Sequence, residues 1–182
     1  CYMKWTSALS TEARLEDAIA ECALKVRSEI DSPDLLVIFI SAHHSEKYHR
    51  LPDLLRKHLT GVLVIGCSAG GIIGEGQEVE NQPGISLSAA ALPGVNLSTF
   101  HITDDALPDG DAPPNVWEQL VNVAPTTDPI FLMLADPFSI RSEHLLMGLD
   151  FAFPQAAKIG GLASGAARQG GNALFLDGNV LR

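Results

Sequence analysis

Glycine and serine residues gather in three segments whose residue types suit the binding of a small ligand. They are 66–71 (Gly-Cys-Ser-Ala-Gly-Gly), 136–139 (Asp-Pro-Phe-Ser) and 160–165 (Gly-Gly-Leu-Ala-Ser-Gly). Each is expected to follow a buried strand, and the carboxyl ends of parallel strands open onto the crevice where α/β proteins bind ligands. Glycine lets backbone amides approach a ligand closely. We therefore expect the three segments to line one pocket, although tight turns and close strand packing explain any one of them equally well.

The expected pocket has an acidic residue and two basic residues close to it in sequence. Asp136 ends an apolar run and precedes a proline, so its carboxylate can cap the following backbone or accept a hydrogen bond from a ligand amine. Arg141 and Arg168 are the basic residues nearest these segments and can clamp a carboxylate, with surface salt bridges as the alternative. The predicted ligand-binding residues are Gly66, Cys67, Ser68, Gly70, Gly71, Asp136, Ser139, Gly160, Gly161 and Ser164.

Residues 66–70 also fit G-x-S-x-G, the nucleophile elbow of α/β-hydrolases. An elbow needs a helix directly after the serine, and residues 71–76 (Gly-Ile-Ile-Gly-Glu-Gly) have no helical period. Asp136 and His144 follow Ser68 in the formal order of a triad but sit on one short piece of chain. A serine hydrolase using Ser68 is therefore a distant alternative, and we predict no catalytic residues and no enzyme. The glycines do not form a P-loop either, because no Lys-Ser/Thr pair follows Gly71.

Thiol and imidazole groups give weaker signals. Cys67 is either a reactive thiolate or, more simply, a small buried residue at a strand end, and Cys22 belongs to a helical apolar face. His43, His44 and His49, with Glu46, are the densest group of metal-ligand types, but their spacing matches no closed structural site. We expect no metal and no cofactor. Three cysteines without a CxxC pair indicate a reducing compartment rather than a disulfide framework.

Composition limits the classes of partner. The 182 residues suit one ordinary domain, and 46% hydrophobic residues with a mean hydropathy of +0.16 indicate a folded core. A net charge of −10 disfavours nucleic acid and anionic membranes, both of which reward basic patches. The longest apolar run, 35–40, is far too short to span a bilayer. We expect a cytoplasmic protein, with a plastid as the alternative, whose partners are a small molecule or another protein.

The first part of the chain is expected to build a βαβ unit. Apolar residues from Leu15 onward recur at helical spacing, whereas 35–40 is an unbroken apolar run typical of a strand covered on both faces. The predicted elements are a helix over 15–30 with Ser10 or Thr11 as N-cap, a central strand over 35–40, a helix over 51–59 and a buried strand over 62–65.

Shorter extended pieces joined by Pro-Gly and Gly turns follow, typical of an antiparallel meander. Its expected strands are 72–73, 78–80, 85–92 and 95–103, followed by an acidic, proline-rich surface loop over 104–114. Beyond the loop we expect a short helix around 117–121, a strand over 130–135, a helix over 145–153, and strands at 159 and 173–176. The fold class is therefore α/β: a mixed sheet with helices packed on it, combining βαβ units with an antiparallel meander.

Several of these segments, in this order and spacing, resemble the N-terminal FIST domain. They are Val62–Gly71, Ala91-Leu92-Pro93-Gly94-Val95, Leu134–Ser139, Phe153-Pro154 and Lys158–Gly165, together with the early Lys4–Ser10 and Phe39-Ile40-Ser41. The resemblance covers nearly the whole chain. Each motif is short, and the ordered set is what makes it specific.

The resemblance implies a sensory or ligand-binding module of the kind found in bacterial signal-transduction proteins and eukaryotic F-box proteins, with amino acids among the proposed ligands. No catalytic residues are established for the family, and some bacterial relatives bind haem, which makes haem the alternative to the absence of a cofactor. Family members carry a C-terminal FIST domain after this one. We thus expect residues 1–182 to form a single N-terminal FIST-like domain, truncated before that partner, with which it would stack two sheets. A protein-interaction scaffold is the alternative function.

Overall fold

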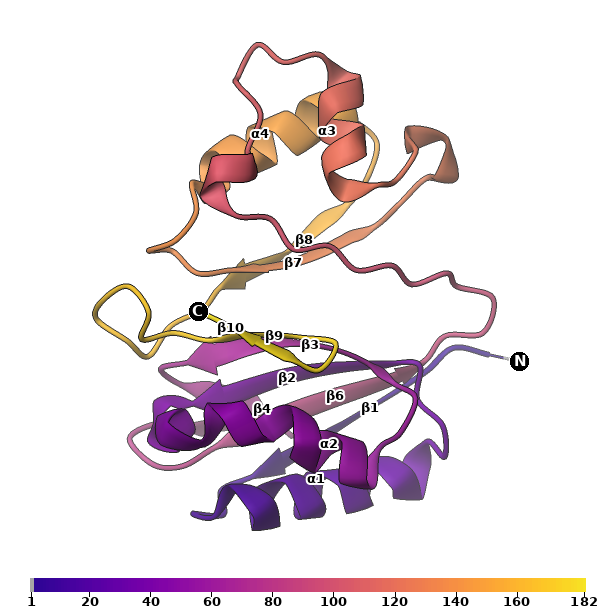
Figure 1. Ribbon diagram of the computed structural model, residues 1–182. Coiled ribbons are helices and arrows are strands. Elements are labelled where there is room, and N and C mark those ends of the chain that lie inside the picture. Colours follow the sequence, from indigo (N-terminus) through magenta and orange to yellow (C-terminus); the bar gives the residue numbers. More distant parts are fainter. Residues whose placement is uncertain (1) are drawn as a thin grey trace. The chain divides into compact units, whose positions relative to one another are not determined.

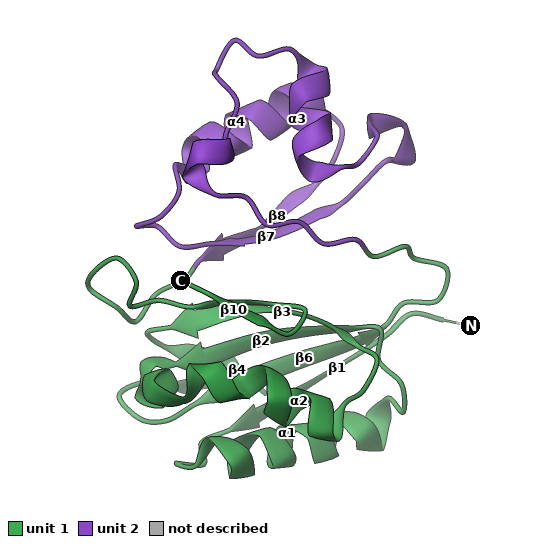
Figure 2. Cartoon of the chain, viewed as in Figure 1, with its two compact units in different colours: residues 1–97, 163–182 green, residues 98–162 purple. Residues whose placement is uncertain are grey.

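The computed structural model describes residues 2–182, which fall into two compact units (Figure 2). Of the described residues, 2–97 and 163–182 form unit 1, and 98–162 form unit 2. Unit 2 is thus inserted in the sequence between two parts of unit 1. Cys1, one of the three cysteines counted above, lies outside the described residues, whereas Cys22 and Cys67 are free, buried thiols.

Unit 1 is built on a six-stranded mixed sheet (Figure 1) with the strand order β1-β6-β2-β3-β9-β10. β2 and β3 pair in parallel and every other neighbouring pair is antiparallel. The expected mixed α/β sheet is therefore confirmed. The strands are β1 (Lys4–Ser10), β2 (Leu35–Ser41), β3 (Leu63–Ala69), β6 (Ile85–Ala91), β9 (Leu174–Leu176) and β10 (Asn179–Leu181).

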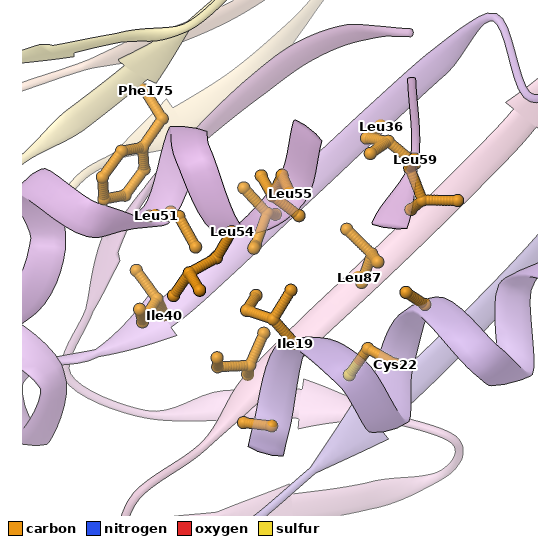
Figure 3. Packing of buried hydrophobic residues seen from close by; sticks show 14 of the residues in the cluster. Ile19, Cys22, Leu36, Ile40, Leu51, Leu54, Leu55, Leu59, Leu87 and Phe175 are labelled. Atoms are coloured by element: carbon orange, nitrogen blue, oxygen red, sulfur yellow. The ribbon is translucent and has the colours of Figure 1, made fainter. Parts of the chain in front are cut away.

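Two helices, α1 (Leu15–Glu29) and α2 (Leu51–His58), cover one face of this sheet (Figure 1). Their apolar sides meet alternate residues of the strands, and Figure 3 shows Ile19 and Leu55 among the packed side chains. Leu36 is completely buried beneath them. Burying a side chain of this size stabilises the fold by about 2 kcal/mol. The packing of α1 and α2 on the sheet therefore holds β2 and β3, including their carboxyl ends, in place.

The predicted helix over 15–30 and the central strand over 35–40 are confirmed, but the predicted N-cap is wrong. Arg14 precedes the first helical residue, and Ser10 ends β1 instead. The Ser10 hydroxyl donates to Glu21 of α1 and accepts a 3.3 Å hydrogen bond from the backbone of Glu12. Pairing of β1 with β6 therefore takes Ser10 away from the helix end, a constraint that local sequence does not contain.

The expected meander is only partly correct. β4 (Ile72–Gly74) and β5 (Gln77–Val79) form a separate two-stranded hairpin, and β6 joins the main sheet between β1 and β2. Residues 95–103, all of them described, contain no strand, so the predicted fourth strand is wrong. β1 supplies the second antiparallel partner of β6 instead, and its sequence was not singled out as a strand.

Unit 2 is a two-stranded parallel sheet with two helices. β7 (Phe131–Ala135) pairs with β8 (Lys158–Leu162), and α3 (Pro114–Val121) packs against α4 (Ser142–Ala152). Trp117, Phe131 and Phe153 form the centre of its own hydrophobic core, with edge-to-face packing of the two phenylalanine rings. Three short 3-10 helices complete the chain: η1 (Ala42–Arg50) in unit 1, and η2 (Asp104–Ala106) and η3 (Pro125–Thr127) in unit 2. No helix within residues 2–182 has the length and apolar character needed to cross a membrane.

Candidate functional site

Half of the predicted ligand-binding residues lie inside strands rather than after them, which corrects the expectation that the segments follow strand ends. Gly66, Cys67 and Ser68 are residues of β3, and Gly160 and Gly161 are residues of β8. Close strand pairing explains two of the glycines. A Cβ on Gly66 would lie 2.3 Å from the backbone oxygen of Ile38, and one on Gly160 would lie 1.7 Å from that of Met133.

In unit 1, hydrogen bonds join three of the predicted residues, Ser68, Gly70 and Ser164. The Ser164 amide donates to the Ser68 carbonyl at 3.0 Å, and the Ser164 hydroxyl accepts from the Gly70 amide at 3.0 Å. The buried Ser68 hydroxyl accepts from the Ala173 amide at 3.0 Å and contacts the side-chain oxygen of Asn172 at 3.5 Å. We call these five residues the Ser68 network. It ties the end of β3 to the segments that precede β9.

The thiol and phenol beside the Ser68 network are held in their neutral forms. Cys67 is 2% exposed, and burial raises the pKa of its thiol to about 11. Burial likewise raises the pKa of Tyr48 to about 12, against a smaller opposing effect of the nearby Arg182. The Tyr48 hydroxyl donates to the Ser41 carbonyl at 3.1 Å. Neither group is an accessible nucleophile in this arrangement.

In unit 2, Asp136 follows β7 directly and makes a local turn with Ser139. The Ser139 hydroxyl donates to the Asp136 carboxylate, and the Ser139 amide donates to the Asp136 carbonyl at 3.1 Å. The Asp136 carboxylate thus accepts from a side-chain hydroxyl in this turn, and its predicted capping of the following backbone stays a prediction. Of the ten predicted residues, Asp136, Ser139, Gly160 and Gly161 belong to unit 2 and the others to unit 1, so a single pocket containing all ten stays a prediction.

Unit 1 contains a hollow of about 710 Å³ with mostly polar walls, which we call the polar hollow. Its walls come from two segments that are distant in sequence, η1 after β2 and the segment that precedes β9. Both lie where β2 and β3 end, because Ser41 is paired with Ala69 at the ends of these parallel strands and Leu174 of β9 is paired with Cys67. The lining residues are Ser45, Glu46, Arg168, Gln169, Gly170, Gly171 and Arg182.

Two arginines and one glutamate give the polar hollow its charge. Arg182 spans its walls, because its guanidinium donates to the Ser45 carbonyl at 3.3 Å and to the Gly170 carbonyl at 3.5 Å. The same guanidinium carbon lies 5.8 Å from the centre of the Tyr48 ring, in cation–π range. Arg168 and Glu46 are exposed, and neither side chain forms an ion pair within residues 2–182.

Sequence reasoning found part of this lining. Arg168 was expected to clamp a carboxylate, and the structure puts it on the polar hollow. The other candidate clamp, Arg141, instead forms a 3.0 Å ion pair with Asp104, which holds the pKa of that carboxyl below its usual range. Arg182 and Ser45 were missed. The contact between them joins residues 137 positions apart, so no local sequence pattern predicts it.

The histidines of η1 do not form a metal centre. His43 and His49 are exposed and His44 is buried, and no group of three or more metal-ligand side chains occurs within the described residues. His44 Nε2 is sealed from solvent and has no hydrogen-bond partner within residues 2–182, and burial lowers the pKa of this imidazole. A haem would need an accessible ring nitrogen beside an apolar slot. The sealed His44 Nε2 does not meet this requirement, whereas His43 and His49 are exposed.

The architecture defines an α/β domain with a mixed sheet and a polar hollow at the carboxyl ends of its parallel strands. Comparison with known proteins gives the family: the model of the FIST N domain matches residues 34–182. The chain therefore belongs to the FIST family, as the sequence motifs suggested.

Curated relatives of the chain include mycobacterial proteins. An uncharacterized protein of Mycobacterium tuberculosis strain H37Rv is 30% identical over 175 residues, which are 95% of this chain and 44% of that protein. An uncharacterized protein of Mycobacterium bovis is 26% identical over 166 residues, which are 90% of this chain and 41% of that protein. The chain thus spans less than half the length of these relatives. No solved structure matches it.

Proposed function

We propose that this chain is a non-enzymatic sensory domain of a signal-transduction protein and that it binds a small ligand in the polar hollow. The observation that carries the proposal is that one hollow of about 710 Å³ is lined by both Arg168 and Glu46, neither of which forms an ion pair with any residue from 2 to 182. The volume lies within the range of small-molecule sites. Membership of the FIST family supports the sensory role.

The opposite charges of Arg168 and Glu46 suit a zwitterion such as an amino acid. A planar guanidinium binds a carboxylate with two parallel hydrogen bonds, and a carboxylate accepts from an ammonium group. Arg182 already bridges the walls of the hollow through two backbone carbonyls and is expected to hold them in place rather than to neutralise the ligand. Gly170 leaves room for the ligand to approach the backbone, because a Cβ there would meet nothing within 4 Å.

The state of the candidate nucleophiles supports a binding role rather than an enzyme. The Ser68 hydroxyl is buried and already accepts from the Ala173 amide, and no histidine is hydrogen-bonded to it within residues 2–182. The Cys67 thiol is buried with its pKa raised to about 11, so it is protonated at neutral pH. Activation of a nucleophile needs a hydrogen-bonded base, and no such bond to the Ser68 hydroxyl or the Cys67 thiol is found in the part of the chain that the structure describes.

Thermal melting of the protein with a panel of amino acids, nucleobases and haem tests the proposal. A ligand that binds only the folded state stabilises it by about 2.7 kcal/mol at a hundredfold excess over Kd, which corresponds to a rise of about 5 °C or more for a chain of this size. We expect a selective rise with one or a few amino acids. Haem should give no Soret band.

Three variants locate the binding. Arg168→Gln and Glu46→Gln should each reduce the rise in melting temperature, because each removes the partner of one ligand charge. Arg27→Gln is the matched control, since Arg27 is exposed in the last turn of α1 and does not line the hollow. Equal responses in all three variants would place the ligand elsewhere. A protein that is folded, free of carried-over ligand and unresponsive to the whole panel would favour the interaction scaffold instead.

A further inference from the structure

A second hollow, of about 440 Å³, lies in unit 1 near the start of β3, and we call it the apolar hollow. It shares no lining residue with the polar hollow. α2 forms one wall, the β9–β10 hairpin forms the other, and the residues that lead into β3 complete it. β9 and β10 extend the sheet beyond β3, and the hollow is lined by residues of this hairpin and of α2.

The side chains that line the apolar hollow are mostly aliphatic or aromatic. Leu55, Leu59 and Phe175 are each less than 5% exposed, and Figure 3 shows them in the same cluster of packed side chains. Val62 and Val64 add two further apolar surfaces. The volume is within the range of small-molecule sites, whereas a helix about 10 Å across would need a longer groove. A compact apolar group therefore fits the hollow best.

The charged groups at the apolar hollow favour a cation as the polar part of that ligand. Arg56 is already engaged, because its guanidinium pairs with Asp53, and a Cβ on Gly178 would lie 2.7 Å from its Nη1. Asp177 is exposed, and its carboxylate has no hydrogen bond or ion pair within residues 2–182. The net charge of −10 also attracts cations to the protein.

We propose that the apolar hollow is a binding site for small amphipathic amines, with an aromatic or branched aliphatic body packed on the half-buried Val62 and Val64 and with the ammonium group on Asp177. The body of the ligand gains from leaving water, and the unneutralised carboxylate selects the sign of its charge. The site is separate from the polar hollow and does not depend on the function proposed for it.

The test compares three probes with the same aromatic body and different charge: phenethylamine, phenethyl alcohol and 3-phenylpropionate. Binding to the protein is followed by titration in two-dimensional amide NMR spectra. Phenethylamine should bind about fivefold more tightly than the alcohol, the size expected for a partly exposed ion pair, and the carboxylate should bind most weakly. The shifted resonances should belong to residues 51–64 and 175–179.

Asp177→Asn isolates the charge without disturbing the turn. Asp177 has a φ of 43°, a left-handed conformation that asparagine adopts as readily as aspartate. In this variant phenethylamine should bind no more tightly than the alcohol, whereas Glu46→Gln, which alters the polar hollow, should leave its binding unchanged. The proposal is overturned if phenethylamine does not bind, if 3-phenylpropionate binds as well, if Asp177→Asn has no effect, or if the shifts map elsewhere. None of these outcomes bears on the amino-acid response of the polar hollow.

Discussion

Replacement of Gly148 by alanine should destabilise unit 2, although alanine is the better helix former. Gly148 is a buried residue of α4, and a Cβ at this position would lie 2.3 Å from two carbons of the Trp117 indole. Ordinary contacts between carbon atoms are about 3.5–4.0 Å, so the ring would have to move by more than about 1 Å. Trp117 is 1% exposed and packed in the core of unit 2, which leaves it no free space.

Two opposing effects decide the sign of this change. Alanine in a helix interior is about 1 kcal/mol more favourable than glycine, whereas overpacking of a well-filled core costs about 1–3 kcal/mol and occasionally more. Because the collision involves a rigid ring rather than the tip of a flexible side chain, we expect the second effect to prevail. The free energy of unfolding should fall by up to about 2 kcal/mol in urea denaturation followed by far-UV circular dichroism.

A double-mutant cycle separates the collision from helix propensity. Trp117→Phe removes the indole atoms that the new methyl group would meet, so Gly148→Ala in the Trp117→Phe background should be neutral or stabilising by up to about 1 kcal/mol. The reasoning is refuted if Gly148→Ala stabilises the protein with Trp117 in place, or if it destabilises both backgrounds equally.

Three further predictions concern unit 1. Ser68→Ala should lower the free energy of unfolding by about 1–3 kcal/mol in urea denaturation, because the Ala173 amide loses its buried acceptor; an unchanged midpoint would contradict this. Burial lowers the pKa of His44 in the folded state, so the unfolded state binds the extra proton first and stability should fall as pH drops from 7 toward 5. Urea midpoints of His44→Gln should vary less with pH over that range, and parallel curves would show the inference to be wrong. With Cys1→Ser and Cys22→Ala to remove the other two thiols, Cys67 should react with a disulfide reagent at pH 8 about 100-fold more slowly when folded than in urea, since its pKa is raised to about 11; comparable rates would mean that the thiol is accessible.

The elements predicted correctly are those in which the spacing of apolar residues along the element itself shows which of its faces are buried. The helical spacing of the apolar residues from Leu15 onward and the unbroken apolar run of β2 each record which faces of the element are covered, so the core of unit 1 could be placed from the sequence. β1 could not, because four of its seven residues are exposed or half-buried and its identity as a strand depends on pairing with β6.

The candidate site was predictable only in its chemistry. The types of Ser68, Ser164 and Arg168 indicated hydroxyl and guanidinium groups near a strand end, and the structure finds all three in unit 1. The extent of β3 could not be read from the sequence, because glycine at position 66 serves the close approach of β2 rather than a turn. The position of Arg182 on the polar hollow could not be predicted either, because it depends on the pairing of β9 with β3 after the chain has passed through unit 2.

The insertion of unit 2 within unit 1 also sets the order in which the sheet can form during synthesis. Residues 1–97 leave the ribosome with β1, β6, β2 and β3 complete, but β9, the remaining partner of β3, follows only after the 65 residues of unit 2. During that interval one edge of β3 has no strand beside it, and an unpaired edge is where a nascent chain pairs with the wrong neighbour. The hydrophobic core of unit 2 is made of residues between 98 and 162, so this unit has time to fold before that edge is closed. Pairing of β3 with β9 joins residues about a hundred positions apart, the largest sequence separation among the strand pairs of the main sheet, so we expect it to form late.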